Sequence, residues 1–237
     1  MSVQLEFVAH ACFRFWHDDR PLIVTDPYTH ETLGIADDGK RLEAETVIVS
    51  SLTDKAHDNV ALVAGNPRVI NALDAHRSNS DTMINDEPLI TVEAAEAPNH
   101  PNGPNDNALY AFKVEDLWCM HMGDLGYQLT AEELAPFVGH CDVLIALIGE
   151  MMTPLHNELD VMIELLDPTW IVPMHYNVPP VTFTMSSIDK FIAHRAHDPV
   201  VLVRHHTVKF PLTMQHLGRP TIVVLEPSGY ELSERLI

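Results

Sequence analysis

The sequence predicts a layered mixed α/β domain, and three observations support this prediction. Short runs rich in β-formers, separated by polar turns, open the chain and are typical of hairpins. Strand-like runs then alternate with helical segments, as in layered α/β proteins. With 237 residues, 46% of them hydrophobic, the chain can bury a sizeable core. Because no linker, low-complexity tract or fixed-period repeat interrupts it, we expect one domain over residues 1–237.

The first half of the chain is expected to be mostly strands. The run Thr46–Ser50 is continuous and apolar, as a strand covered on both faces would be. A helix is expected over Asp58–Ala64, because Gly65-Asn66-Pro67 is a helix-end signal. The other predicted strands are Val3–Ala9, Cys12–Trp16, Pro21–Thr25, Arg68–Asn71, Leu89–Glu93, Ala108–Val114 and Leu117–Met122.

The second half is expected to contain the main helices. Thr130 and Glu133 form a capping-box pattern, which predicts a helix to about Val138. A second helix is expected at His156–Leu166, ended by Asp167-Pro168. The remaining predictions are strands at Val143–Ile148, from Trp170, at Val200–Arg204 and at Thr221–Glu226, and a helix at Ile188–Arg195.

Charge and cysteine content limit the possible functions. A net charge of −20 argues against nucleic acid or an anionic membrane as a partner. Three widely spaced cysteines, without a Cys-x-x-Cys pair, exclude a thiolate zinc cluster and favour a reducing compartment. No secretory signal and no membrane-spanning run is recognisable. We therefore expect a soluble cytoplasmic protein with a small-molecule substrate, and leave open whether it forms a homo-oligomer.

Two apolar runs end on side chains that commonly bind metals. Trp170–Tyr176 delivers His175 where the chain must turn, and Leu117–Gly126 delivers Asp124 in the same way. His57 is a third candidate. A histidine or carboxylate held at the rim of a sheet by a rigid strand is a common way to present a metal. Together the three residues indicate an active site.

With these residues in view, the chain resembles the metallo-β-lactamase fold, and within it the ascorbate-6-phosphate-lactonase-like metal-dependent hydrolases. The resemblance covers nearly the whole length and implies an αββα sandwich with a metal site at one edge of its two sheets. It rests on His10-Ala11-Cys12, Asp26-Pro27, Ser50 to His57, Gly123-Asp124-Leu125-Gly126, Pro173-Met174-His175-Tyr176 and the closing segment Pro220–Pro227.

The chain departs from the family's H-x-H-x-D-H signature. Ser51 and Thr53 stand where the first two histidines should be, the aspartate position falls on Lys55 or Ala56, and the last histidine survives as His57. Hydroxyl groups are poor zinc ligands compared with imidazole. The first of the family's two metal sites would therefore keep at most His100 and the bridging Asp124.

The second metal site fares better. His57, Asp124 and His175 would supply two imidazole nitrogens and a carboxylate oxygen, leaving a position open to water. This set suits one divalent transition metal, with zinc preferred and manganese or iron as alternatives. Asp124 and His57 would also act in catalysis. The resemblance thus implies hydrolysis of a lactone, ester or phosphodiester by a metal-bound hydroxide.

Four further residues have open or minor roles. We expect His10 to be a hydrogen-bonded structural histidine and His121 to point into the sheet packing. Lys55 is expected to be a surface lysine, although its ammonium group could instead neutralise Asp124 in the space of the missing metal. Glu150 is either an additional ligand, a general base or an exposed carboxylate.

Two functions of different class remain open at this point. Retention of Asp124 and His175 favours a metal-dependent hydrolase. Loss of most of the H-x-H-x-D-H ligands favours a catalytically degenerate member of the family, whose cleft serves as a small-molecule binding or protein-interaction site. Metal analysis of the purified protein would separate the two.

Overall fold

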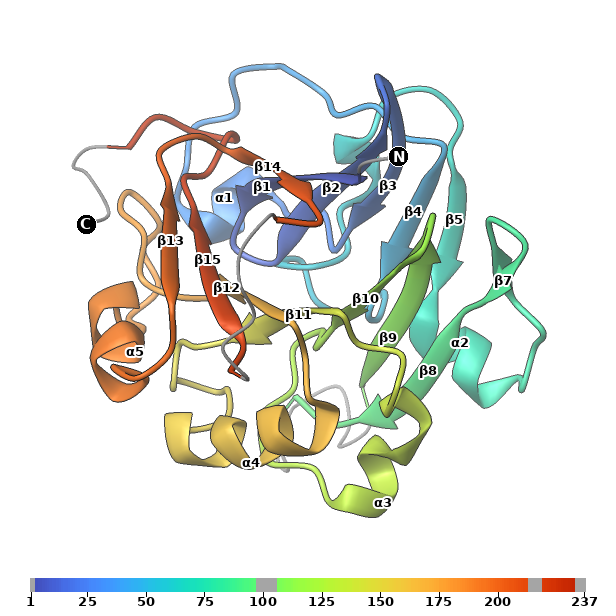
Figure 1. Cartoon of the computed structure of the whole chain (residues 1–237). Coiled ribbons are helices and arrows are strands. Elements are labelled where there is room, and N and C mark those ends of the chain that lie inside the picture. Colours follow the sequence, from blue (N-terminus) through green and yellow to red (C-terminus); the bar gives the residue numbers. More distant parts are fainter. Residues whose placement is uncertain (1–2, 97–105, 213–218, 233–237) are drawn as a thin grey trace.

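Two large β-sheets form the centre of the molecule (Figure 1). The computed structural model describes residues 3–96, 106–212 and 219–232. The first sheet has the strand order β14-β1-β2-β3-β4-β5 and the second the order β13-β15-β12-β11-β10-β9-β8. Within the described residues, no helix has the length and apolar composition needed to cross a membrane.

The first sheet begins with the predicted hairpins. Strand β1 pairs antiparallel with β2 and β14, and β2 pairs antiparallel with β3, whereas β3, β4 and β5 are parallel. The carboxyl ends of β1, β3 and β4 therefore meet at one edge. The bounds are β1 Val3–Ala9, β2 Cys12–His17, β3 Arg20–Thr25, β4 Thr46–Val49, β5 Arg68–Asn71 and β14 Thr207–Phe210.

The second sheet brings two further strand ends to its own edge. Strands β10, β11 and β12 run parallel, as do β12, β15 and β13, while β9 pairs antiparallel with β8 and β10. The bounds are β8 Ile90–Ala94, β9 Asn107–Val114, β10 Leu117–His121, β11 Val143–Leu147, β12 Trp170–Met174, β13 Val200–Val203 and β15 Thr221–Leu225; a small hairpin, β6 Met83–Ile84 and β7 Glu87–Pro88, lies apart.

The core lies between the two sheets. Phe15 from β2 meets Phe112 from β9 edge to face, with ring centroids 4.9 Å apart, and both side chains are fully buried. This packing of aromatic side chains from both inner faces joins the sheets into one hydrophobic core. All three cysteines are buried and unpaired, as their spacing predicted.

Helices cover the outer faces, which confirms the predicted αββα layering. Helices α3, α4 and α5 pack on the second sheet. Figure 1 shows α3 and α4 on the side of this sheet that faces away from the first sheet. A second apolar cluster, formed around α1 and the 310 turn η1, covers the outer face of the first sheet. The bounds are α1 His30–Leu33, η1 Val60–Leu62, α2 Ala72–Arg77, α3 Ala131–Leu134, η2 Ala135–Phe137, α4 His156–Leu166 and α5 Ile188–His194.

The predicted helix at Asp58–Ala64 is wrong, since only the 310 turn η1 forms there. The Asn59 amide donates to Pro27 O at 2.7 Å, and the Ala64 amide donates to Leu42 O at 2.8 Å. These donors are therefore used by neighbouring segments and cannot build an α-helix. The prediction also missed α1, α2, β6, β7 and β14, all of six residues or fewer. The Thr130 capping box is confirmed, with η2 continuing α3 to Phe137.

Candidate metal centre

Five strand ends bring polar side chains to one edge of the sandwich. His10 follows β1, Asp26 follows β3, and His57 lies in the loop after β4; Asp124 and His175 follow β10 and β12. His10 and His175 both have left-handed backbone, with φ values of 57° and 54°, and the His175 amide donates to His10 O at 3.0 Å. Each of these two histidines therefore lies at a turn, where the chain changes direction at the end of its strand.

His57 is held in one orientation by a buried carboxylate. Its Nδ1 donates to Asp26 Oδ2 at 3.1 Å, and both side chains are essentially inaccessible. Asp26 also accepts hydrogen bonds from the Ser50 amide, the Ser50 hydroxyl and Tyr110 Oη, so its position is fixed. Because Nδ1 is occupied, Nε2 of His57 faces the cluster, where it has no hydrogen-bond partner among the described residues. A carboxylate behind a histidine is the usual support of a metal-binding imidazole.

Asp124 lies between His57 and His175. Its Oδ2 is 3.6 Å from His57 Nε2, and its Oδ1 is 3.3 Å from His175 Nε2. Burial would raise the pKa of Asp124, but the two imidazoles lower it to about 2. Burial would likewise lower the pKa of His57, but the carboxylates of Asp124, Asp26 and Asp54 raise it to about 10. The carboxylates of Asp124, Asp26 and Asp54 therefore favour a positive charge at His57, on the side that faces Asp124.

His10 completes a triad of imidazoles. Its ring centroid lies 4.0 Å from that of His175 and 5.3 Å from that of His57. The expectation of a hydrogen-bonded His10 is wrong, since neither ring nitrogen of this buried side chain has a partner in the described part of the chain. Burial, followed by the neighbouring His175 and His57, holds the pKa of His10 well below its usual range. His10 is therefore a neutral imidazole with a free lone pair.

Asp54 is a site residue that the sequence reasoning missed. Its Oδ2 lies 3.7 Å from His57 Nε2, three residues along the same turn. Asp54, His57 and Asp124 offer ligand atoms within 4.8 Å of one another, as do His10, His57 and His175. The H-x-H-x-D-H pattern predicts its aspartate at Lys55 or Ala56, one or two residues beyond Asp54. Asp54 could have been identified from the sequence, because it is the only carboxylate between Ser50 and His57.

The residues present fit a divalent transition metal. Ligand atoms that bind one zinc ion at about 2.0–2.2 Å lie roughly 3–4 Å apart. Asp124 Oδ2 has this spacing from His57 Nε2, and Asp124 Oδ1 has it from His175 Nε2. His57 Nε2, Asp124 Oδ1 and the ring nitrogens of His10 are buried without hydrogen bonds among the described residues. Such groups are costly unless a ligand satisfies them. The structure thus brings the predicted His57, Asp124 and His175 together and adds His10 and Asp54.

The side chains of Ser51 and Thr53, at the signature positions, contact each other. Their hydroxyl oxygens are 3.1 Å apart, and Thr53 Oγ1 donates to Asp106. The other candidate ligand of the first metal, His100, lies outside the described residues.

The remaining candidates do not join the cluster. Lys55 is exposed and forms no ion pair with Asp124 within the described ranges, as expected for a surface lysine. Glu150 binds Lys190 Nζ and Ser186 Oγ instead of facing the site. His121 is confirmed as a packing residue, since its Nε2 donates to Ala11 O and its Nδ1 accepts from the Gly123 amide.

A cleft of about 240 Å³ opens onto these side chains. Its lining includes Glu96, and burial together with the charges of Asp124 and Asp54 raises the pKa of this carboxyl to about 8. Phe183 also lines the cleft and contacts the His10 ring edge-on, with 5.3 Å between the ring centroids. The cluster is therefore buried yet reachable from solvent by a small molecule.

Comparison with known proteins identifies a family and relatives described as metal-dependent hydrolases. A family model described as "Beta-lactamase superfamily domain" matches residues 4–175. Two relatives are described as UPF0173 metal-dependent hydrolases. One, from Pyrococcus horikoshii, is 32% identical over 88 residues, covering 37% of this chain and 39% of that protein. The other, from Thermococcus onnurineus, is 24% identical over 215 residues, covering 82% of this chain and 94% of that protein.

A solved structure shows the same fold. A Thermotoga maritima protein, assigned to the Zn-dependent hydrolases of the metallo-β-lactamase superfamily, superposes with a TM-score of 0.68 at 25% identity. The alignment covers 94% of this chain and 98% of that one. The ascorbate-6-phosphate-lactonase-like branch is not distinguished by these matches.

Proposed function

The chain belongs to the β-lactamase superfamily, and from this premise we propose that it is a metal-dependent hydrolase with one ion at His57, Asp124 and His175. The observation that carries the proposal is the convergence, at the carboxyl ends of β1, β4, β10 and β12, of buried ligand atoms that have no hydrogen-bond partner among the described residues. Packing alone gives no reason to bury imidazole nitrogens and a carboxylate oxygen in this way.

The residues around the proposed ion have separate roles, as expected for an open catalytic site. Asp26 holds His57 so that Nε2 is free for an ion, and Asp124 supplies negative charge. A bound divalent metal supplies an activated water near neutral pH and polarises the oxygen of the bond under attack. His10 or Asp54 would be the additional ligand in the described set.

The geometry favours a single ion. His57 belongs to both potential ligand groups, but only its Nε2 is free, because Nδ1 is bonded to Asp26. One nitrogen binds one ion, so the two groups cannot each hold a metal through His57. The hydroxyls of Ser51 and Thr53, which replace imidazoles, add no strong ligand.

The substrates we propose are small lactones, esters or phosphodiesters. The test is a panel of the three classes, assayed after loading the protein with Zn²⁺, Mn²⁺ or Fe²⁺. We expect hydrolysis with at least one metal, and its loss in Asp124→Ala and in chelator-treated protein. Metal binding without hydrolysis of any substrate would instead favour the catalytically degenerate binding protein. No binding of any of these metals would contradict the metal centre itself.

A further inference from the structure

The cleft has an apolar wall. Met151 and Met152, in the loop after β11, line it although they are 47% and 56% exposed, and Met185 and Phe183 line it from the segment before α5. Thioether side chains are flexible and polarisable, and they adapt to apolar ligands of varied shape. Large apolar side chains left partly in water beside a site of chemistry indicate where an apolar part of the substrate would lie.

Apart from the proposed ligand His57, the described lining of the cleft has no cationic side chain. Its lining carries the carboxylates of Asp54, Glu96 and Asp124, and within the described residues it includes no lysine or arginine. The two positive charges of a divalent ion are balanced by Asp54 and Asp124, and Glu96, whose pKa is raised to about 8, adds no positive charge. The loaded site therefore has no excess positive charge with which to attract an anion.

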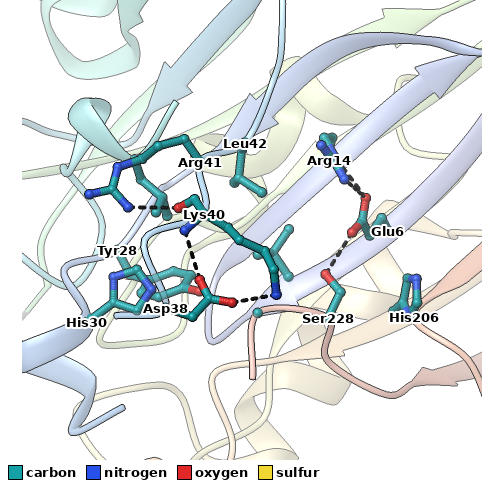
Figure 2. Close-up of a pocket in the computed structure, with 13 residues that line it drawn as sticks. Glu6, Arg14, Tyr28, His30, Asp38, Lys40, Arg41, Leu42, His206 and Ser228 are labelled. Carbon is teal, nitrogen blue, oxygen red and sulfur yellow. Dashed lines mark hydrogen bonds and ion pairs between the residues drawn. The ribbon is translucent and has the colours of Figure 1, made fainter. Parts of the chain in front are cut away.

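The nearest lysines lie outside the cleft lining. Lys55 is exposed between the lining residues Asp54 and Ala56 and is not itself part of the lining. Lys190 is paired with Glu150. Arg14 and Lys40 line a separate pocket against the outer face of the first sheet, where Figure 2 shows them bound to Glu6 and Asp38. Phosphate groups are usually bound by arginine, lysine or helix N-termini. The cleft above the metal centre has no such lysine or arginine group within the described chain.

We propose that the substrate is an uncharged carboxylic ester or lactone whose apolar group lies against Met151, Met152 and Phe183, and that phosphodiesters and other anionic esters are rejected. This inference rests on the proposed hydrolase function. In the reaction, water adds to the acyl carbon and the acyl carbon–oxygen bond breaks. One proton of the water goes to the departing alkoxide, and the other is lost from the carboxylic acid product to solvent.

The kinetic test compares matched substrates. In 4-nitrophenyl butyrate and the 4-nitrophenyl monoester of succinate, a methyl and a carboxylate occupy the same place at the end of the acyl chain. The rate without protein is subtracted first, because the succinate carboxylate attacks its own acyl carbon and releases nitrophenol unaided. After this subtraction, we expect kcat/KM of the metal-loaded protein to be about tenfold or more higher for the butyrate, because Asp54 and Asp124 line the cleft and repel the second carboxylate. Bis(4-nitrophenyl) phosphate, a phosphodiester, should be the poorest substrate.

A charge placed on the apolar wall should change this preference. In Met152→Lys, the ratio of butyrate to succinate kcat/KM should fall by about threefold or more, because the lysine would attract the charged ester. Val138→Lys is the matched control, since Val138 is 55% exposed and lies outside the cleft lining. Its ratio should equal that of the parent protein.

A binding measurement tests the ligand class without catalysis. 4-Nitrophenyl butyl ether and 4-(4-nitrophenoxy)butanoate form a pair of similar length and cannot be hydrolysed as esters. With methyl-¹³C methionine in the protein, the neutral ether should shift the Met151 and Met152 signals, assigned from Met151→Leu and Met152→Leu. The charged ether should bind about tenfold more weakly or not at all.

The outcomes separate the two proposals. Equal or faster hydrolysis of the succinate ester or of the phosphodiester would overturn the substrate class and leave the hydrolase intact. Hydrolysis of none of the substrates would contradict the proposed function, and the ether pair would then decide the ligand class. Equal binding of both ethers, or shifts confined to other methionines, would overturn it.

Discussion

Asp26→Asn should weaken metal binding although Asp26 is not a ligand. The buried carboxylate accepts hydrogen bonds from the Ser50 amide at 2.8 Å, the Ser50 hydroxyl at 2.9 Å, Tyr110 Oη at 3.0 Å and His57 Nδ1 at 3.1 Å. An asparagine keeps one acceptor oxygen but replaces the other with an NH₂ group. This group is a donor, and it would face the groups that donate to that second oxygen in the parent protein. Because Nδ1 of His57 can then lose its acceptor, the proton can move to Nε2 and block the ion.

The magnitude follows from those contacts. Loss of the carboxylate behind a ligating histidine typically costs about 10–100-fold in metal affinity. Two charge-assisted bonds at about 1.5–3 kcal/mol each, offset by the relief of burying a charge, give a loss of roughly 2–4 kcal/mol in the free energy of unfolding. The assays are competition with a zinc-chelating dye and urea unfolding of the metal-free protein.

Two control variants separate orientation from charge and from stability. Asp58→Asn removes a nearby charge that acts on His57 electrostatically, without removing the hydrogen bond to Nδ1. Tyr110→Phe removes one bond to Asp26 but leaves that of His57, so it should cost about 1 kcal/mol of stability and little metal affinity. If Asp26→Asn binds zinc as tightly as the parent protein, or only as weakly as Asp58→Asn, the positioning role of Asp26 is refuted.

Three further predictions concern other parts of the site and its surroundings. Asp124→Ala and His175→Ala should each lower metal affinity by about 100-fold or more and abolish hydrolysis, because each removes one of the three main ligands, which His10 or Asp54 does not replace. Full activity of either variant, with elemental analysis showing no bound metal, would contradict this. Gly149→Ala should cost about 1–3 kcal/mol of stability and weaken metal binding, since its Cβ would lie 2.2 Å from His175 O, whereas Gly139→Ala, with nothing within 4 Å, should leave metal affinity unchanged; equal affinities would show that His175 tolerates the displacement. Burial would raise the pKa of Glu150, but Lys190, Ser186 and the His156 amide lower it to about 2, so its stabilisation is present above the unfolded-state pKa near 4.5 and is lost as the pH falls towards 2. Glu150→Gln should therefore lose about 1–2 kcal/mol at pH 7 and progressively less below pH 4.5, and the exposed Glu164→Gln should show neither effect in urea unfolding; a loss that persists at pH 2 would point to another cause.

Local patterns were sufficient to predict the central strands. Strands such as β1 and β12 are apolar, continuous and bounded by turns, so their extent is determined largely by neighbouring residues. Strand β14 was missed because four residues carry little signal, and its partner β1 lies about 200 residues away in sequence. The helix predicted at Asp58–Ala64 failed for a similar reason, since its backbone donors bond to distant segments.

The site was predictable where a strand directly presents a residue. Asp124 and His175 follow β10 and β12 closely, so their positions could be read from the strand ends. Asp54 could not be assigned in this way, because it lies in the loop after β4, and His10, although it directly follows β1, was expected to be structural. Which side chain of a turn faces the cluster depends on its backbone, such as the left-handed φ of 57° at His10, and on long-range contacts such as that between His10 and His175. Neither is encoded in local periodicity.

Anomalous diffraction from crystals of the zinc-loaded protein, recorded at the zinc edge, tests the central claim most directly. The account predicts one strong peak per chain, within about 2.0–2.2 Å of ligand atoms from His57, Asp124 and His175, with His10 or Asp54 adjoining. Two peaks about 3.5–4 Å apart would show that a dinuclear centre survives despite Ser51 and Thr53. A peak elsewhere, with none at His57, would contradict the metal centre altogether.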